Sequence, residues 1–461
     1  MHRSTLIGSA VARRMPRAVA KSKQPDSDGE SDRDHGLYLI CAVELFERLG
    51  GAMAFCLLVL YLNEYVGMGA GWATRTTSYV HMLSYAAGIL GGLLGDKRMG
   101  TGRAALAGLV LLTLGYCMLG YAHQSAVRLV TAACLVVAGS GFYKPNCTAL
   151  LGALYPCKHP NRTRAFYWFY YAINLSSMIA PCLGGLVRAA LGWEAMFRLA
   201  AGFVVIAWGV LALGRQYLGR AALTYRAPAA PVPEPSSSLD NTPHTASRTG
   251  ALVFVLLVFV LFGAVLSQGY GILLLWARDE ARRSLFGYQI PPDFFAALPA
   301  AFVLVCGPLL GRLTKALEVR GVHLDGSLRF TLGMLLCALA YSLMLVASLL
   351  THDTELASPL WLVGCKILLA LGELLGVPVA LALAESLALS RTRGLTMGLS
   401  YGSHALGFWL GGEVSALWPR CSHAAFFALL TGGCVVAAVM IHAQAWRLTR
   451  ALSGNVDPRR R

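Results

Sequence analysis

Charge is scarce in this chain of 461 residues. Only 13% of its residues are charged, whereas 56% are hydrophobic, and the mean hydropathy is +0.58. A soluble globular protein carries about 25% charged residues. This deficit argues against an ordinary soluble domain and predicts a protein embedded in a membrane.

Paired cysteine motifs and a metalloprotease signature are also missing. The twelve cysteines include no C-x-x-C pair, so neither a disulfide framework nor a zinc site is expected. The histidines are scattered and form no H-E-x-x-H, and a membrane enzyme is the function class that the sequence supports least, so no enzyme is expected. Residues 1–36 lack the apolar core of a cleavable signal peptide.

Long apolar runs, by contrast, recur along the whole chain. A helix of roughly 20 apolar residues crosses the hydrocarbon core of a bilayer. The sequence predicts twelve such spans, at residues 37–62, 76–95, 103–121, 126–151, 165–190, 194–218, 250–276, 294–313, 328–350, 359–389, 393–416 and 422–446. The expected fold class is therefore an all-α membrane protein.

A polar segment rich in Pro, Ser and Thr divides the spans six and six. Such a composition cannot bury enough apolar surface to fold. We expect a disordered tail (1–36), a six-helix bundle (37–218), a cytosolic linker (219–249), a second six-helix bundle (250–449) and a basic tail (450–461). This layout is typical of the major facilitator superfamily, whose substrate site lies between the bundles at mid-membrane.

The distribution of basic residues predicts the orientation. The two tails, the linker and the even-numbered loops, such as "DKRMGTGR" and "CKHPNRTR", hold most of the 39 Lys and Arg residues. Basic loops stay on the cytosolic side, so both termini are expected there. The net charge of +16 then reflects topology and contact with membrane lipids, and nucleic-acid binding is not expected.

Three charges interrupt the first predicted span. Glu44, Glu47 and Arg48 lie three and four residues apart, on one face of a helix, and Arg48 is ~16 Å from its start. Each such residue costs ~2.5–3.5 kcal/mol to insert, so the three must face the bundle interior and have partners. Glu44 or Glu47 can exchange a proton when these partners rearrange, which would couple transport to a proton gradient.

Other spans carry buried polar groups of the same kind. Lys144 lies beside Pro145 in the fourth span, Asn174 in the fifth, and Glu373 in the tenth. Arg48 and Lys144 in one half and Glu373 in the other form a site with a positive and a negative end, suited to a zwitterion. The alternative is a set of structural ion pairs that hold the helices in register.

The end of the second predicted span is rich in glycine and is followed by three charged residues. Gly88, Gly91, Gly92 and Gly95 permit close helix packing. Asp96 with Lys97 or Arg98 predicts a cytosolic latch formed in one transport conformation only; simple helix capping is the alternative for Asp96.

Several of these motifs resemble the proton-dependent oligopeptide transporter family. "ELFER" is similar to the first-helix E-x-x-E-R, "GSGFYKPNCTAL" to the fourth-helix G-x-x-K-P-N, and "FYWFYYAINLSS" to the fifth-helix F-Y-x-x-I-N. "GGLLGDKRMG" and "GELLGVPVALALAESLALS" resemble the ends of the second helix and the tenth helix. The resemblance covers nearly all of the chain, in order.

The resemblance implies roles for individual residues. Glu44, Glu47 and Arg48 would couple protons. Tyr85, Lys144, Asn174, Gln268 and Glu373 would bind substrate together with Arg48, Glu373 taking the peptide amino terminus. The chain departs from the family where Leu49–Met53 lacks two tyrosines and where Phe55 replaces an arginine found in many members. "VELFER" with "LVLYLN" resembles the peptide/histidine branch of endolysosomal membranes.

The sequence therefore predicts proton-coupled symport of di- and tripeptides, or of histidine, by alternating access. No cofactor is expected beyond the proton gradient, and the plasma membrane or an endolysosomal membrane would hold the protein. Two rivals stay open: a carrier of another small anion or amino acid with this fold, and a transporter-like receptor that does not transport.

Overall fold

The computed structural model describes residues 27–155, 159–218, 244–285, 287–321, 325–351, 356–387 and 393–453. Most of the predicted tails and linker lies outside these ranges. Where the predicted tail is described, it differs from expectation, because residues 27–36 are helical. Hydrophobicity marks where a helix enters the membrane and not where the helix begins, which explains the ten-residue difference.

The first half of the chain is a helical bundle. Its elements are α1 (Ser27–Cys56), α2 (Leu58–Leu60), η1 (Tyr61–Tyr65), α3 (Ala70–Leu94), η2 (Gly95–Met99), α4 (Thr101–Gly120), η3 (Ala122–Gln124), α5 (Ala126–Leu154), α6 (Arg162–Gly214) and η4 (Arg215–Leu218). Helix α6 contains the fifth and sixth predicted spans, which meet at Gly192, whose φ of 83° and ψ of 176° bend the helix. Glycine adopts this left-handed φ without the steric cost of a Cβ.

The second half repeats this organisation. Its elements are α8 (His244–Ser267), η6 (Gln268–Tyr270), α9 (Ile272–Asp279), β1 (Ser284–Leu285), β2 (Tyr288–Gln289), α10 (Phe294–Val319), α11 (Gly326–Thr351), α12 (Pro359–Leu387), α13 (Arg393–Ser415), η8 (Trp418–Arg420) and α14 (His423–Ser453). The strands β1 and β2 form a small antiparallel hairpin, with Ser284 opposite Gln289.

The helices agree with the predicted membrane protein. Within the described part of the chain, nine helices are long and apolar enough to cross a membrane. Helix α6 holds two spans, and α3 and α13 are absent from the nine because they are rich in Thr, Ser and His. Helices thus cover most of the described part of each predicted span, although the span 37–62 runs through α1, α2 and η1, and the span 250–276 is interrupted by η6.

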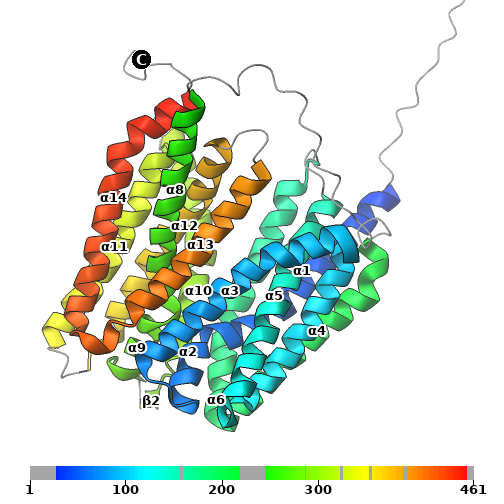
Figure 1. The fold of residues 1–461 in the computed structure, drawn as a ribbon, viewed down its shortest axis with the longest axis horizontal. Helices are drawn as coiled ribbons and strands as arrows, with labels where there is room; N and C mark the ends of the chain where they lie inside the picture. The colour runs from blue at the N-terminus through cyan, green and yellow to red at the C-terminus, as the bar shows by residue number, and fades with distance from the viewer. Residues whose placement is uncertain are drawn as a thin grey trace, which may run out of the picture.

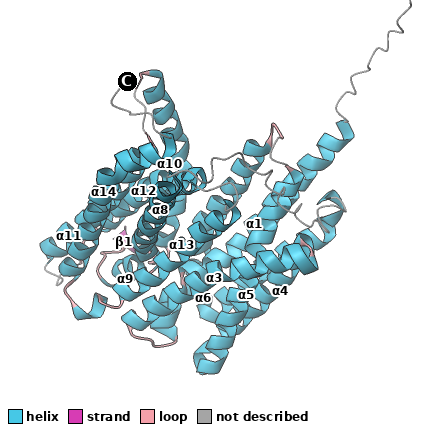
Figure 2. Ribbon diagram, turned by 45° about the horizontal axis from the view of Figure 1, so that its top comes forward, coloured by secondary structure: helices cyan, strands magenta, loops and turns pink. Residues whose placement is uncertain are grey.

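The two bundles lie side by side and meet along two helix pairs. Helix α3 packs against α13, and α6 packs against α10. In Figure 1 the first bundle is drawn in blue to green and the second in green to red, and Figure 2 shows the almost entirely helical content. We call the end with β1, β2 and α9 the hairpin end, and the end where α1 starts and α14 stops the termini end.

Glycines bring α3 and α5 into backbone contact. A Cβ on Gly91 would overlap the carbonyl oxygen of Gly141 and lie 2.8 Å from the Phe142 nitrogen, and one on Gly95 would overlap the Asn146 amide. A Cβ on Gly88 would meet nothing within 4 Å. Two of the four predicted glycines therefore make the tight contact.

We expect Gly91→Ala to lower the free energy of unfolding by about 1–3 kcal/mol, because the added methyl group forces α3 and α5 apart. Gly88→Ala is the matched control on the same helix and should be neutral or slightly stabilising. Thermal unfolding in detergent measures both. Equal melting temperatures for the two variants would contradict the close packing of α3 on α5.

Candidate functional site

The charged group on α1 is buried and mutually paired. Arg48 Nε donates to Glu44 Oε1 over 2.8 Å and lies 3.6 Å from Glu47 Oε2. The Tyr143 hydroxyl on α5 donates to the other Glu44 oxygen over 2.8 Å. Glu44 and Glu47 are 2% and 1% exposed, whereas the Arg48 side chain is 25% exposed. Glu44 is thus held from two sides, and the guanidinium reaches open space.

Glu47 is paired less completely than Glu44. Among the described residues, its Oε2 and the nearby Tyr116 hydroxyl have no hydrogen-bond partner. A Cβ on Gly51 would lie 3.4 Å from Glu47 Oε1 and 3.5 Å from the Tyr116 hydroxyl, so this glycine leaves room beside both groups. An incompletely paired buried carboxyl is a group that can take up a proton at little structural cost.

Arg48 and Lys144 share one cavity, which is lined mainly by the first bundle. This cavity has a volume of about 110 Å³, and its lining includes Arg48, Lys144, Phe55, His81 and Tyr85. The Lys144 ammonium lies 5.1 Å from the centre of the Phe55 ring and 5.6 Å from that of Tyr85. No carboxylate of the described chain forms an ion pair with Lys144, so its positive charge faces the cavity against aromatic rings.

Glu373 lines a second cavity, which is lined mainly by the other bundle. This cavity of about 90 Å³ is also bordered by Lys366, His404 and Pro299. The Lys366 ammonium donates to the Gly269 carbonyl over 2.8 Å and is 1% exposed. Lys366 is therefore tied to the backbone of η6, and Glu373 is the carboxyl that faces the cavity.

Three aromatic side chains separate the two cavities. Tyr85, Tyr270 and Phe408 line both of them. The Phe408 ring centre lies 5.8 Å from that of Tyr85 and 6.2 Å from that of Tyr270. The basic groups of the first half and the acidic group of the second half thus face two adjoining cavities. The rings that divide these cavities can be moved by side-chain rotation.

Ion pairs join the bundles at the hairpin end. Arg75 of α3 contacts Glu413 of α13 over 2.7 Å, and the Tyr79 hydroxyl donates to the same carboxylate. Arg188 of α6 contacts Asp293, at the start of α10, over 2.7 Å. These contacts close the site on that side.

The contact between α3 and α13 ends near the middle of the helices. Its last ring pair is Tyr85 with His404, whose centres are 5.2 Å apart. Beyond this pair, toward the termini end, Leu90 is 66% exposed and Tyr401 is 51% exposed. The described contacts between α3 and α13 thus lie between the middle of these helices and the hairpin end, and Figure 1 shows the two helices diverging toward the termini end.

Two predicted substrate ligands do not line either cavity. Asn174 donates to the Tyr170 carbonyl within its own helix over 3.0 Å, and it is Ser177, one turn further, that borders the first cavity. The Gln268 amide donates to the Gly411 carbonyl over 3.0 Å and accepts from the Ser415 hydroxyl over 2.8 Å. Gln268 is thus buried in a helix contact between η6 and α13.

The predicted latch is unformed. Asp96 is half-buried on η2, and Lys97 and Arg98 are exposed. In the described ranges no ion pair includes these residues, because the two halves are apart at the termini end. Their gating role stays a prediction about the opposite conformation.

Sequence reasoning missed the side chains that join the halves. Glu413 is a charge inside a predicted span, the same signal that identified Glu44, and Arg75 directly precedes the predicted second span; neither residue received an assignment. Of the three aromatic residues between the cavities, which we call the aromatic wall, Tyr85 was assigned through the family resemblance. Tyr270 and Phe408 gave no signal, since a Tyr or Phe in an apolar helix is normally a packing residue.

One motif of hydrolases is present but lies in the wrong structure. Gly398-Leu-Ser-Tyr-Gly402 matches G-x-S-x-G, which serves as a nucleophile only on a sharp turn between a strand and a helix. Here it lies within α13, where the Ser400 hydroxyl donates to the Thr396 carbonyl over 2.9 Å. It is a helical serine and not a nucleophile elbow.

Known proteins with related sequences are transporters. YclF, an uncharacterized transporter of Bacillus subtilis, is 26% identical over 456 residues, covering 86% of this chain and 90% of its own. Dipeptide and tripeptide permease B of Edwardsiella piscicida is 26% identical over 433 residues, covering 82% and 85%.

Solved structures share the fold. A crystal structure of a mutant of peptide transporter POT in complex with sulfate superposes with a TM-score of 0.83 at 25% identity, covering 90% of this chain and 95% of that one. A POT family transporter in complex with 5-aminolevulinic acid has the same fold, with a TM-score of 0.81 at 21% identity, covering 90% and 96%.

The predicted fold class, two six-helix bundles of the major facilitator type, is confirmed by these similarities. The family model of the POT family matches residues 103–221 and 239–428, well over half of the sequence, so this chain belongs to the POT family of transporters.

Proposed function

We propose that this protein carries di- and tripeptides in symport with protons, by alternating access between its two bundles. The observation that supports this most is the placement of Arg48 and Lys144 in one cavity and Glu373 in the adjoining cavity, with only aromatic rings between them. The similarity to dipeptide and tripeptide permeases points in the same direction.

The two charged ends suit the two ends of a peptide. Arg48 presents a planar fork and Lys144 a point charge, and both bind carboxylates through charge-assisted hydrogen bonds. Glu373 would take the ammonium group of the peptide across the aromatic wall. Because only the ends are held by charge, side chains of varied size can be accepted between them.

Glu47 is the proposed site of proton coupling, with Glu44 and Arg48. The nearest cation to Glu47 is Arg48, whose Nε lies 3.6 Å from Glu47 Oε2. A peptide carboxylate that draws Arg48 toward the cavity would therefore move this cation away from Glu47. A buried carboxylate without a cation is costly, so Glu47 would take up a proton. One charge moved across 100 mV supplies ~2.3 kcal/mol, which permits roughly 40-fold accumulation of substrate.

Alternating access requires the closed end to open. The Arg75–Glu413 and Arg188–Asp293 pairs would break, while Asp96, Lys97 and Arg98 would find partners at the other end. By the distribution of basic residues, the termini end would face the cytosol and the hairpin end the outside of a cell or the lumen of an endolysosome.

We expect Arg48→Ala and Glu373→Ala each to reduce dipeptide uptake into proteoliposomes about 30-fold or more, because each leaves one charged end of the peptide unpaired. Arg198→Ala and Glu318→Ala are matched controls, since both residues are exposed and form only surface ion pairs. Normal uptake by either site variant would refute the assignment. Saturable binding by the unmutated protein without uptake would identify a receptor instead.

Glu47→Gln should separate transport from proton coupling. A glutamine cannot release a proton, so an inward acid gradient should no longer raise uptake. Exchange of labelled for unlabelled dipeptide, which moves no net charge, should continue. Glu318→Gln serves as control, and gradient-driven accumulation by Glu47→Gln at the level of the unmutated protein would move the coupling elsewhere.

Reversing one charge of the Arg75–Glu413 pair should slow uptake, because it removes a contact that holds the hairpin end closed. The double reversal, Arg75→Glu with Glu413→Arg, should recover part of the loss, with a coupling energy of about 0.5–3 kcal/mol. Uptake rates of the four proteins form the cycle. Additive losses would show that the two residues act independently.

A further inference from the structure

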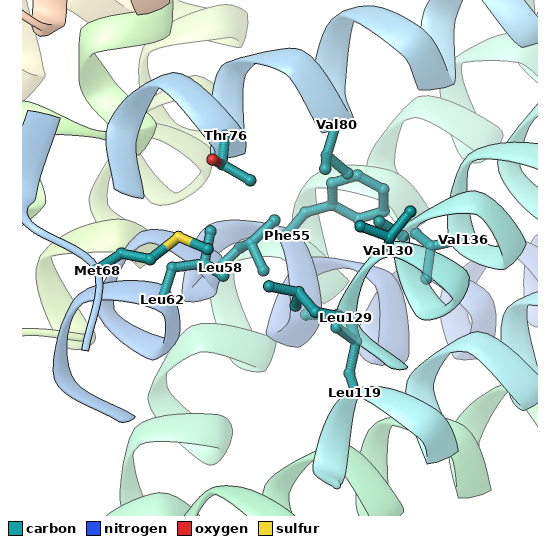
Figure 3. A pocket seen from close by; sticks show the side chains of 12 residues that line it. Phe55, Leu58, Leu62, Met68, Thr76, Val80, Leu119, Leu129, Val130 and Val136 are labelled. Atoms are coloured by element: carbon teal, nitrogen blue, oxygen red, sulfur yellow. The ribbon is translucent and has the colours of Figure 1, made fainter. Parts of the chain in front are cut away.

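A third cavity lies in the first bundle, toward the hairpin end. It has a volume of about 230 Å³ and is almost wholly apolar, between the end of α1, α3, and the starts of α2 and α5. Figure 3 shows Phe55, Leu58, Val80, Leu129 and Val136 around it. Neither the proton-coupling group nor the two charged cavities account for this space.

Phe55 connects this apolar cavity to the charged one. Its side chain borders both the apolar cavity and the cavity of Arg48 and Lys144. The same helix faces run through the two cavities, since Phe55 lies two turns from Arg48 on α1 and Ala133 lies three turns from Lys144 on α5. The two spaces are neighbours along shared faces, with an aromatic ring between them.

The Phe55 ring is held from the charged side. The Lys144 ammonium lies 5.1 Å from its centre, and the His81 ring packs edge-on at 5.0 Å and 69°. A carboxylate bound by Lys144 competes for this ammonium and weakens its attraction to the ring. Substrate binding would thereby free the Phe55 side chain to turn.

We propose that the apolar cavity receives the side chain of the C-terminal residue of the peptide, which makes the transporter selective for a bulky apolar residue there. This inference rests on the proposed function. In a peptide whose carboxylate lies on Arg48 and Lys144, the last side chain branches from the next carbon atom, beside Phe55. A cavity of about 150 Å³ lined by apolar residues can hold benzene, so this larger one accommodates a Leu or Phe side chain.

The cavity also has a mouth toward the surface of α5, where Val130 is 62% exposed. A hydrocarbon chain of the bilayer is therefore the rival occupant. The two occupants can be told apart by the order of residues in a peptide. A lipid chain in the cavity would affect all peptides alike, whereas a site for the C-terminal side chain would distinguish two peptides that differ only in residue order.

The test compares isomeric dipeptides as inhibitors of labelled Ala-Ala uptake. Ala-Leu and Leu-Ala have identical composition and charged ends, and differ only in where the leucine lies. We expect Ala-Leu to inhibit at a concentration lower than Leu-Ala by a factor of about ten or more. Ala133→Phe, which fills the cavity, should bring this ratio close to one, and Ala133→Leu provides a milder version should the first fail to fold.

Cys134→Phe is the matched control, since Cys134 is the next residue of α5 and is exposed outside the cavity. It should keep the ratio of the unmutated protein. The inference is overturned if Ala-Leu and Leu-Ala inhibit the unmutated protein equally, or if folded Ala133 variants keep the difference between them. If the Ala133 variants lose uptake of all peptides to the same extent, the cavity is a lipid site. If the unmutated protein takes up no dipeptide at all, the proposed function itself is wrong. Equal inhibition by the two isomers with normal uptake contradicts only the side-chain site.

Discussion

A charge inside a bilayer must have a partner or face a polar cavity, and this constraint organises the molecule. Glu44 and Glu47 are nearly inaccessible, and Arg48 pairs closely with Glu44 and more loosely with Glu47 while its side chain remains a quarter exposed. Tyr143 fixes Glu44 from α5, so the ionic cluster also ties two helices of the first bundle together. Without this cluster, the cavity beside it would keep Lys144 and lose the Arg48 guanidinium.

The same constraint explains why the two halves meet where they do. Polar and charged residues on α3 and α13 lower the apolar character of both helices, and the charged ones find their partners across the interface, as Arg75 and Glu413 show. Thr77 and Ser84, by contrast, donate to carbonyls of α3 itself. A helix of this kind is poorly suited to face lipid and well suited to an interface that opens and closes. Polarity within a span thus marks the moving surface as well as the site.

The sequence could predict features that depend on residues close together along the chain, and it could not predict contacts between residues far apart in the sequence. The spans, their six-and-six division and the cluster on α1 follow from local composition and helical spacing, and were predicted. The partner of Gln268 could not be, because the Gly411 carbonyl and Ser415 are distant in sequence and any polar group may be satisfied by backbone. The same holds for Asn174, whose amide bonds its own helix. The role of Phe55 as a wall between two cavities depends on three-dimensional neighbours that no spacing encodes.

The hydrogen bond from Lys366 to the Gly269 carbonyl fixes the position of one positive charge in the second bundle. The ammonium keeps its charge when it donates to a carbonyl, and Lys366 and Glu373 lie two turns apart on α12 and border the same cavity. Because the backbone of η6 holds this ammonium, the ion pairs of the described residues include none between Lys366 and Glu373. A cation that arrives at Glu373 therefore has no existing salt bridge to break before it can pair with the carboxylate.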